Sequence, residues 1–366
     1  MNICSLELEQ FRNYEQARFV FDPAVNLICG ENGQGKTNLL EAAAACSTMR
    51  LFRTAQKKEG LRFGQDHARI QAEFQAQGRD FALELRLSRL KSMEIYKNGV
   101  RQKRQADAQG LLKTVLFCPE DLMLVRQGAA ARRRFLDTAL CQLRPNYARY
   151  LEEYHRLHDH KTRILRDSEQ KPSLLSMWED FSLRMAHIGA QIIRYRAYYS
   201  KKLLAAAASV YADIAPHEAL SGVYQTVSSV TDPYASAGQI EKQLVDHVLQ
   251  HKQAEIAAKS CLSGPHKDDL VLMLDGRSAA SFASQGQVRT CTLSLKLAER
   301  ELFFSEDGEY PVLLLDDVLS ELDRRRQDFV LNHIAAGQVM ITCCEDGVSD
   351  KLRAGAVFSI KNGKIV

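Results

Sequence analysis

The sequence contains no apolar run long enough to cross a lipid bilayer. Among its 366 residues the longest nearly apolar stretch is 203–212, about ten residues, whereas a spanning helix needs about 20. Residues 1–5 carry neither the basic nor the apolar segment of a secretory signal. We therefore expect a cytoplasmic protein that makes no contact with a membrane.

The nine cysteines lack the spacing of a zinc site or a redox motif, because none form a CxxC pair and no paired histidine motif accompanies them. We interpret them as the reduced thiols of a cytosolic protein. Cys343 and Cys344 are adjacent. They could form a reactive pair, but a buried strand end is the favoured interpretation. The sequence also lacks internal repeats and low-complexity segments.

An ordinary composition, 45% hydrophobic and 26% charged, excludes a disordered or fibrous chain. The net charge of +4 alone says little about partners. Basic residues are concentrated in three segments, which predict a polyanion-binding face, although three solvated surfaces would have the same composition. These segments are 126–166, with ten basic and four acidic residues, and 48–62 and 91–104, with five basic residues and one acidic residue each.

Hydrophobic periodicity divides the chain into three regions. Roughly the first 90 residues alternate as strands do, and Asn98-Gly99 predicts a hairpin turn just after them. Residues 132–211 have two stretches of helical periodicity, with a break expected around 167–173. We expect 221–238 to be loop or irregular strand and 239–260 to be helical, and roughly the last 100 residues mix helices and strands. We therefore expect an α/β core interrupted by a helical insert. The predicted division is 1–120, 121–261 and 262–366.

One segment matches the phosphate-binding pattern G-x-x-x-x-G-K-[ST] in full. A short apolar strand precedes it and a Leu/Ala/Glu-rich helix follows it, as this motif requires. The glycines let successive N–H groups point at phosphate, Lys36 would meet the β- and γ-phosphates, and Thr37 would ligate Mg²⁺. The predicted nucleotide-binding residues are Gly30, Glu31, Asn32, Gly33, Gln34, Gly35, Lys36, Thr37 and Asn38.

A second apolar strand, 312–315, ends in the carboxylates Asp316 and Asp317. Two acids at the end of a buried strand are costly without a cation, so a strand cap is the weaker interpretation. We predict that Asp316 holds the Mg²⁺ shell and that Asp317 is the catalytic base that polarises water. About 280 residues separate this strand from the phosphate-binding loop. An insert must therefore leave the core and return, as in ATP-binding-cassette ATPases of chromosome maintenance and recombination.

Two further motifs resemble those of cassette ATPases. Ser284, Gln285, Gly286 and Gln287 lead into a helix and resemble the signature motif, in which a serine hydroxyl and a glycine amide bind a γ-phosphate. Residues 316–323 resemble the Walker B strand running into a D-loop, which ends here at Asp323. The resemblance implies an ATP-binding-cassette-type P-loop ATPase head with a helical insert domain.

The whole chain resembles the RecF family of bacterial recombination mediators. The matching blocks are 11–14, 30–37, 117–122, 132–137, 264–270, 284–287 and 315–323, in this order. The resemblance implies a weak, DNA-stimulated ATPase that binds single- and double-stranded DNA at gaps and acts with RecO and RecR to help load recombinase. Recombinational repair, replication restart and the damage response are the implied processes. An SMC-like structural clamp with little turnover and a soluble P-loop metabolic kinase are the alternatives.

The resemblance also implies an ATP-dependent homodimer. One chain carries one phosphate-binding loop and one signature motif, and the signature of cassette ATPases reaches the nucleotide of the other protomer, which implies a C2 dimer around two ATP. Asp317 stands where those ATPases usually have the longer glutamate, so we expect slow turnover. The sequence departs from the family at Val288, where glutamine is usual, and at 342–344, where transporter-type cassettes have a switch histidine.

DNA contacts are expected from basic side chains rather than from a base-reading module, which the sequence does not contain. Phosphate contacts of this kind give affinity that is sensitive to salt and independent of base sequence. His266 and Lys267 either contact DNA or brace the signature region, with bracing favoured. Gln127 is either the γ-phosphate-sensing glutamine or a surface residue. The predicted DNA-binding residues are Arg50, Arg53, Lys57, Arg132, Arg133 and Arg134.

Overall fold

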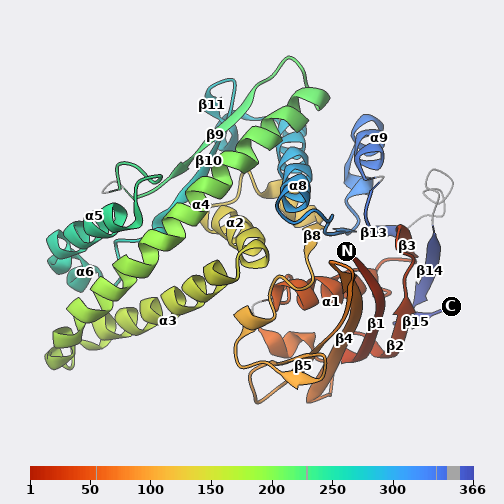
Figure 1. Ribbon diagram of the computed structural model, residues 1–366, viewed down its shortest axis with the longest axis horizontal. Helices are drawn as coiled ribbons and strands as arrows, with labels where there is room; N and C mark the ends of the chain where they lie inside the picture. The colour runs from red at the N-terminus through yellow and green to blue at the C-terminus, as the bar shows by residue number, and fades with distance from the viewer. Residues whose placement is uncertain (55, 228–229, 335, 344–354) are drawn as a thin grey trace.

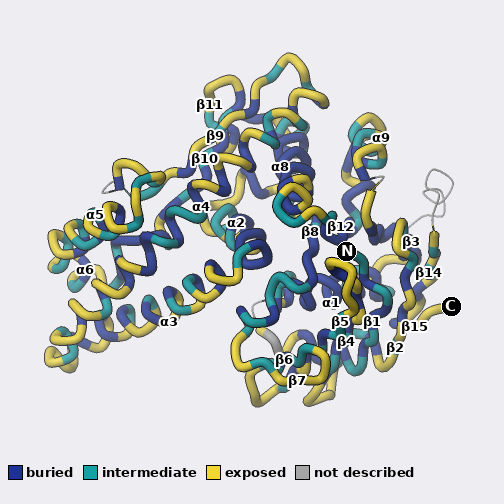
Figure 2. The backbone as a smooth tube through the Cα atoms, in the orientation of Figure 1, coloured by how far each residue is buried: buried dark blue, intermediate teal, exposed yellow. Residues whose placement is uncertain are grey.

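The computed structural model describes residues 1–54, 56–227, 230–334, 336–343 and 355–366. Both chain termini lie in a β-rich lobe, and a long helical arm extends away from it (Figure 1). Buried residues concentrate along α2, α4 and α8, where the arm meets the lobe (Figure 2).

The first sheet forms from strands whose apolar side chains alternate, as predicted. Burial alternates along β4 because successive side chains point to opposite faces. The strands are antiparallel, in the order β2-β1-β4-β5-β6-β7. The predicted turn joins β6 to β7, and both Asn98 and Gly99 have the positive φ that a tight hairpin requires. The bounds are β1 (Asn2–Phe11), β2 (Tyr14–Val20), β4 (His67–Ala76), β5 (Arg79–Ser88), β6 (Glu94–Lys97) and β7 (Val100–Arg101).

The second sheet brings the ends of five parallel strands to one edge. Its order is β15-β14-β3-β13-β12-β8, and β15 returns antiparallel beside β14. The carboxyl ends of parallel strands lie at the same edge, so residues that follow β3, β8, β12 and β13 become neighbours. The bounds are β3 (Val25–Cys29), β8 (Thr114–Phe117), β12 (Val312–Leu315), β13 (Val339–Cys343), β14 (Ala356–Lys361) and β15 (Lys364–Ile365).

Helices cover both faces of the second sheet. Residues 39–47 of α1 are all buried, and α1 packs in one cluster with Ile70 of the first sheet and Leu314 of the second. Because α1 lies between the two sheets, its side chains are buried on every side of the helix. On the other face, Leu293 of α8 and Val330 of α9 pack with residues of β12 and β13. The bounds are α1 (Lys36–Thr48), α8 (Gln285–Asp307) and α9 (Arg324–His333).

The arm is built on the two helical stretches that the periodicity predicts. α4 has 37 residues, about 55 Å, and packs on α3, α5 and α8. The predicted break follows Asp167, where α3 ends. The helix predicted over 239–260 is divided at His251. The bounds are α2 (Ala129–Leu143), α3 (Pro145–Asp167), α4 (Trp178–Ile214), α5 (Ala237–Gln250) and α6 (Lys252–Ala258).

A small third sheet, β11-β10-β9, joins the arm to the last part of the chain. The segment 221–238 was expected to be loop or irregular strand. Its first part belongs to the regular strand β9, which pairs with β10 along six residues. The largest hydrophobic cluster therefore crosses the predicted boundary at 261/262, and the division into three domains stays a prediction. The bounds are β9 (Leu220–Gln225), β10 (Asp269–Leu274), β11 (Arg277–Ser278) and α7 (Ala279–Phe282).

Among the helices that the structure describes, none combines the length and the apolar character needed to span a membrane. The predicted strand end at Cys343 is confirmed as buried, and its Sγ lies 2.9 Å from Sγ of Cys29. Cys344 lies outside the described residues.

Candidate functional site

The predicted phosphate-binding loop lies between β3 and α1, at the carboxyl edge of the second sheet. Gly30, Gly33 and Gly35 have φ of +150°, +80° and +123°, a region that other residues rarely adopt. A Cβ atom on Gly30 would lie 2.5 Å from the carbonyl oxygen of Ile360. Residues 31–33 are exposed. The loop therefore presents a closely folded backbone, with its tip accessible to a ligand.

The first turn of α1 faces the same space. Its N-cap is Gly35, which has no side chain to accept from the first N–H groups of the helix. These groups and the positive end of the helix dipole favour an anion in front of the loop. The buried Lys36 side chain donates to the carbonyls of Gly30 and Glu31, the latter at 3.1 Å from Nζ. The ammonium group is thus held at the loop.

Hairpins from both ends of the chain brace the loop. Asn13 Nδ2 donates to the Gln34 carbonyl at 2.8 Å, and the Gly363 N–H donates to the same carbonyl at 2.9 Å. The Asn362 N–H donates to Gln34 Oε1 at 2.6 Å. Asn13, Asn362 and Gly363 were not among the predicted site residues. The only sequence feature that pointed to Asn13 was its place in the block 11–14, which matches the RecF family.

Asp316 and Thr37 meet in front of the loop, as predicted from their positions after a strand and a glycine-rich turn. The Thr37 hydroxyl donates to Asp316 Oδ1 at 3.0 Å, and the Thr342 hydroxyl donates to the same oxygen at 3.0 Å. Burial raises the pKa of the Asp316 carboxyl, and these two hydrogen bonds oppose the shift. A bound cation would also favour the ionised form.

Asp317, the predicted base, is held by its backbone. Its N–H donates to Thr342 Oγ1 at 2.8 Å, and its φ is +53°, a strained conformation for a residue other than glycine. The Ser320 hydroxyl donates to the Asp317 carbonyl at 2.7 Å. Glu120, in η3 (Pro119–Met123), lies near enough to raise the pKa of Asp316, as Asp317 also does. Glu120 was not among the predicted site residues, although it follows β8, the strand beside β12.

The signature residues form the N-terminus of α8. Ser284 is the N-cap, and its Oγ accepts from the Gln287 N–H at 3.3 Å, while Gln287 Oε1 accepts from the Ser284 N–H at 2.8 Å. Gln287 Nε2 also donates to Glu218 Oε1 at 2.9 Å. Ser284 and Gln285 are exposed. Val288, where the family usually has glutamine, is buried.

Arg326 connects the D-loop to the signature helix. Asp323 caps α9 by accepting from the Arg326 N–H at 3.0 Å, and the two side chains also form an ion pair. Hydrogen bonds to its oxygens lower the pKa of Asp323, with the Arg326 N–H as the largest cause. The Arg326 guanidinium donates to Thr290 Oγ1 at 2.9 Å and to the Gly286 carbonyl at 3.2 Å. A cavity of ≈ 280 Å³ adjoins these residues, lined by His217 and Glu218 among others.

The three predicted DNA-binding arginines of α2 have different environments. Arg132 donates from Nε and Nη2 to the two carboxylate oxygens of Asp269, at 2.7 and 2.8 Å, and from Nη1 to three backbone carbonyls. Arg133 donates to the Asp268 carbonyl at 2.5 Å, and burial lowers its pKa. Arg134 is exposed. Arg132 therefore connects α2 to β10, Arg133 connects α2 to the residue before β10, and Arg134 is the exposed member of the three. The DNA-binding role of all three stays a prediction.

The other three predicted DNA-binding residues follow α1 in the chain. Arg53 is exposed and donates to Asn38 Oδ1 at 3.0 Å. Arg50 is exposed. It lies near Cys141 of α2, because its charge lowers the pKa of that thiol, which burial raises to about 12. Lys57 begins the short helix η1 (Lys57–Gly60).

His266 contacts the arm, and the predicted bracing of the signature region stays a prediction. Its Nδ1 lies 2.7 Å from the Tyr154 hydroxyl, and burial lowers its pKa to about 3. Gln127 is exposed and donates to the Glu120 carbonyl at 3.4 Å. A role for Gln127 in sensing the γ-phosphate stays a prediction.

The oxygen donors at the loop fit Mg²⁺. This ion is usually bound by one or two protein oxygens together with substrate phosphates, and the Thr37 hydroxyl and Asp316 carboxylate converge as such donors would. Among the described residues, no group of three or more His, Cys, Asp or Glu side chains could hold a metal. The fit to Mg²⁺ therefore depends on phosphate oxygens from a nucleotide.

Comparison with known proteins agrees with this geometry. The profile of the RecF/RecN/SMC N terminal domain matches residues 2–365. A protein of Bacillus subtilis named DNA replication and repair protein RecF is 36% identical over 372 residues, covering 100% of both chains. This chain belongs to the RecF family. The RecF protein of Lachnospira eligens is 34% identical over 373 residues, covering 100% of this chain and 99% of its own.

Solved structures confirm the predicted fold class. A RecF structure, described as the recombination mediator protein RecF-ATP in the RecFOR pathway, has a TM-score of 0.92 at 29% identity, covering 100% of this chain and 96% of its own. The Smc head domain of Pyrococcus furiosus has a TM-score of 0.56 at 14% identity, covering 100% of this chain and 95% of its own, and shares the fold alone. The chain is an ATPase head of the RecF and SMC type with a helical arm.

Proposed function

We propose that this RecF family member is an ATP-dependent DNA-binding protein of recombinational repair and replication restart, and that ATP hydrolysis acts as its switch. The observation that carries the proposal is the hydrogen bond from Thr37 Oγ1 to Asp316 Oδ1, at 3.0 Å. It lies in front of the glycine-rich loop and the N-terminus of α1. This arrangement supplies the phosphate cradle and the oxygen donors that an ATPase needs.

The nucleotide chemistry follows from the residues of the loop. Residues 30–38 would bind the phosphates through backbone N–H groups, and Lys36 would turn from the loop carbonyls toward the β- and γ-phosphates. Thr37 and Asp316 would hold Mg²⁺, which when bound neutralises charge on the β- and γ-phosphate oxygens. Asp317 would accept a proton from the attacking water. Because its side chain is short and its backbone is fixed by Thr342, we expect slow hydrolysis.

The exposed signature residues support a homodimer that completes each site in trans. Ser284, Gln285 and Gly286 would leave their contacts within α8 and reach the γ-phosphate of the partner's ATP. Asp323 lies on the same surface because Arg326 joins it to Gly286. ATP would then hold the dimer together, and hydrolysis would release it.

The DNA-bound state is proposed from family membership and charge. Exposed basic side chains, Arg50, Arg53 and Arg134 among them, would meet phosphates of single- and double-stranded DNA at gaps. RecO and RecR type mediators would act with the DNA-bound dimer to load recombinase. We expect this work to take place in the cytoplasm.

Sizing the protein with ATP, with ADP and without nucleotide, each with and without gapped DNA, tests the proposal together with a phosphate-release assay. We expect dimers with ATP but not with ADP or without nucleotide. We also expect slow phosphate release, at a rate that rises when DNA is added. Stable ATP dimers without any phosphate release would instead identify a structural clamp. Phosphate transfer to a small-molecule acceptor would identify a kinase, and monomers under every condition would contradict the trans arrangement.

A further inference from the structure

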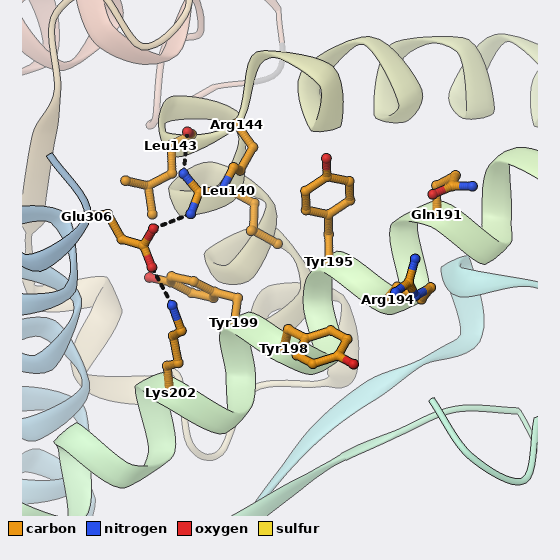
Figure 3. Close-up of a pocket in the computed structure, with 10 residues that line it drawn as sticks. All are labelled: Leu140, Leu143, Arg144, Gln191, Arg194, Tyr195, Tyr198, Tyr199, Lys202 and Glu306. Carbon is orange, nitrogen blue, oxygen red and sulfur yellow. Dashed lines mark hydrogen bonds and ion pairs between the residues drawn. The ribbon is translucent and has the colours of Figure 1, made fainter. Parts of the chain in front are cut away.

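The arm contains a cavity of ≈ 310 Å³ that the nucleotide site does not use. It lies where α2, α4 and the C-terminal part of α8 meet, and tyrosine and cationic side chains line it (Figure 3). Leu140 and Leu143 of α2 supply apolar surface. A concave site of this size with a few polar groups is typical of small-ligand binding.

One face of α4 carries aromatic rings between two cations along the cavity. The cavity is lined by Arg194, Tyr195, Tyr198 and Lys202. The last three follow Arg194 by about one, four and eight residues, which places all four on one side of the helix. The row spans about 12 Å along the axis. Aromatic rings beside cations are the combination with which proteins bind single-stranded nucleic acid, because bases stack on the rings while phosphates meet the cations.

The rings are held in place before any ligand binds. Tyr198 packs edge-on against Tyr234 at 5.4 Å between ring centroids, and its hydroxyl donates to the Tyr234 carbonyl at 3.3 Å. Its side chain is nevertheless 47% exposed. Tyr195 packs edge-on against Tyr147 at 5.6 Å. A fixed and partly exposed ring loses little entropy when a base stacks on it.

Positive charge exceeds negative charge around the cavity. Arg144 and Lys202 both pair with Glu306, and Lys202 Nζ lies 2.5 Å from Oε1 (Figure 3). These two cations lower the pKa of the Glu306 carboxyl, with Lys202 as the largest cause. Arg194 is a third cation, 5.9 Å from the Tyr198 ring centroid. Its buried Nε has no hydrogen-bond partner within the described part of the chain.

We propose that this cavity binds a base of single-stranded DNA, with the base against Tyr195 and Tyr198 and the flanking phosphates at Arg194 and Lys202. The inference rests on the proposed DNA-binding function and names one place where a single strand is held. Two flat rings flanked by a cation on each side suit a base flanked by two phosphates. An acidic peptide with one aromatic side chain is the competing ligand that the test must separate.

Two oligonucleotides of equal length separate stacking from charge. We would measure binding of oligothymidylate and of an abasic strand with the same number of phosphates. Tyr198→Leu should weaken oligothymidylate binding about tenfold and leave abasic binding unchanged, because only the first ligand has bases to stack. Tyr198→Phe keeps the ring and should bind like the wild type. Tyr96→Leu, which removes a ring beneath Arg86 in the first sheet, is the matched control.

The cations predict a different change. Arg194→Gln should weaken binding of both strands and lower the slope of log K against log salt by about 0.7, the value for one phosphate of a single strand. Equal loss of both ligands in Tyr198→Leu, with a cooperative thermal transition like that of the wild type, would overturn the stacking proposal.

Crosslinking places the ligand directly. Oligonucleotides carrying 5-iododeoxyuridine should crosslink on irradiation to Tyr195 or Tyr198, and an acidic aromatic peptide should not displace them. Crosslinks confined to other residues, or displacement by the peptide, would overturn the proposal. Normal ATP-dependent dimers with crosslinks elsewhere would refute this site alone. Crosslinks at Tyr198 without any ATP response would refute the ATP switch and leave this site standing.

Discussion

Lys36 is the residue whose loss should affect nucleotide binding most directly. Lys36→Ala removes the ammonium held at the loop by the carbonyls of Gly30 and Glu31. We expect ATP affinity to fall about a hundredfold, since charge-assisted hydrogen bonds to phosphate are lost. Binding of a fluorescent ATP analogue measures the effect. Lys58→Ala, at an exposed lysine, is the control, and unchanged affinity in Lys36→Ala would refute the assigned phosphate site.

Asp317 should separate hydrolysis from binding. Asp317→Asn keeps the shape of the side chain and the backbone hydrogen bond to Thr342, but it removes the proton acceptor. We expect phosphate release to fall about a hundredfold while the ATP dimer persists longer on DNA. Single-turnover hydrolysis and sizing with ATP measure the two effects. A normal hydrolysis rate would move the base elsewhere, and Glu120 would then be the next residue to change.

At the scale of elements, α2 is tied to β10 by its arginines. Arg132→Met leaves Asp269 without its bidentate partner and should cost about 2 kcal/mol of unfolding free energy, measured by urea denaturation. Arg134→Glu should leave stability unchanged because its side chain is exposed. It should instead flatten the salt dependence of duplex binding by about 0.9 or more. The reverse pattern would contradict the roles that we assign to the two residues.

α8 carries a titratable side chain in its buried face. Burial raises the pKa of Glu299 to about 7, and Lys296, 3.8 Å away, opposes the shift. The folded state therefore holds the proton more tightly than the unfolded state, so this carboxyl lowers stability progressively as pH rises from about 4.5 to 7. Glu299→Gln removes that titration.

The corresponding measurement compares unfolding free energies of Glu299→Gln and wild type at several pH values. The variant should match the wild type near pH 4.5 and exceed it by about 3 kcal/mol at pH 8. Glu301→Gln makes the same chemical change at a half-exposed position of the helix and serves as control. If the difference in unfolding free energy between Glu299→Gln and wild type did not vary with pH, the raised pKa of Glu299 would be contradicted.

At the scale of the whole molecule, the signature serine should act only across the dimer. Ser284→Arg places a bulky cation on the exposed N-cap of α8 and leaves the phosphate-binding loop of the same chain intact. We expect ATP binding of near-normal affinity, no dimer and very slow hydrolysis. Sizing and phosphate release check these outcomes.

Mixing Ser284→Arg with Lys36→Ala sharpens this test. In a mixed dimer the two defects share one site, and the other site is wild type throughout. Partial recovery of hydrolysis supports the trans arrangement. Dimerisation and normal hydrolysis by Ser284→Arg alone would refute the composite site.

The sequence by itself determined the strands β3 and β12, the glycine-rich loop and the acids that follow β12. Each is a contiguous pattern whose chemistry depends on near neighbours, so the loop, Lys36, Thr37, Asp316 and the fold class could be predicted. The hairpin at Asn98 and the two arm helices were predicted for the same reason, because turn preference and helical periodicity are local.

The tertiary structure alone decided which distant side chains meet. Pairing of parallel strands brings Thr342 to Asp316, and packing of α2 on β10 gives Arg132 its ion pair with Asp269. The strand β9 forms because β10, far away in sequence, supplies its hydrogen-bond partners. The row of rings on α4 becomes a binding cavity only where α2 and α8 close its sides. Such contacts depend on long-range packing, which periodicity and composition do not encode.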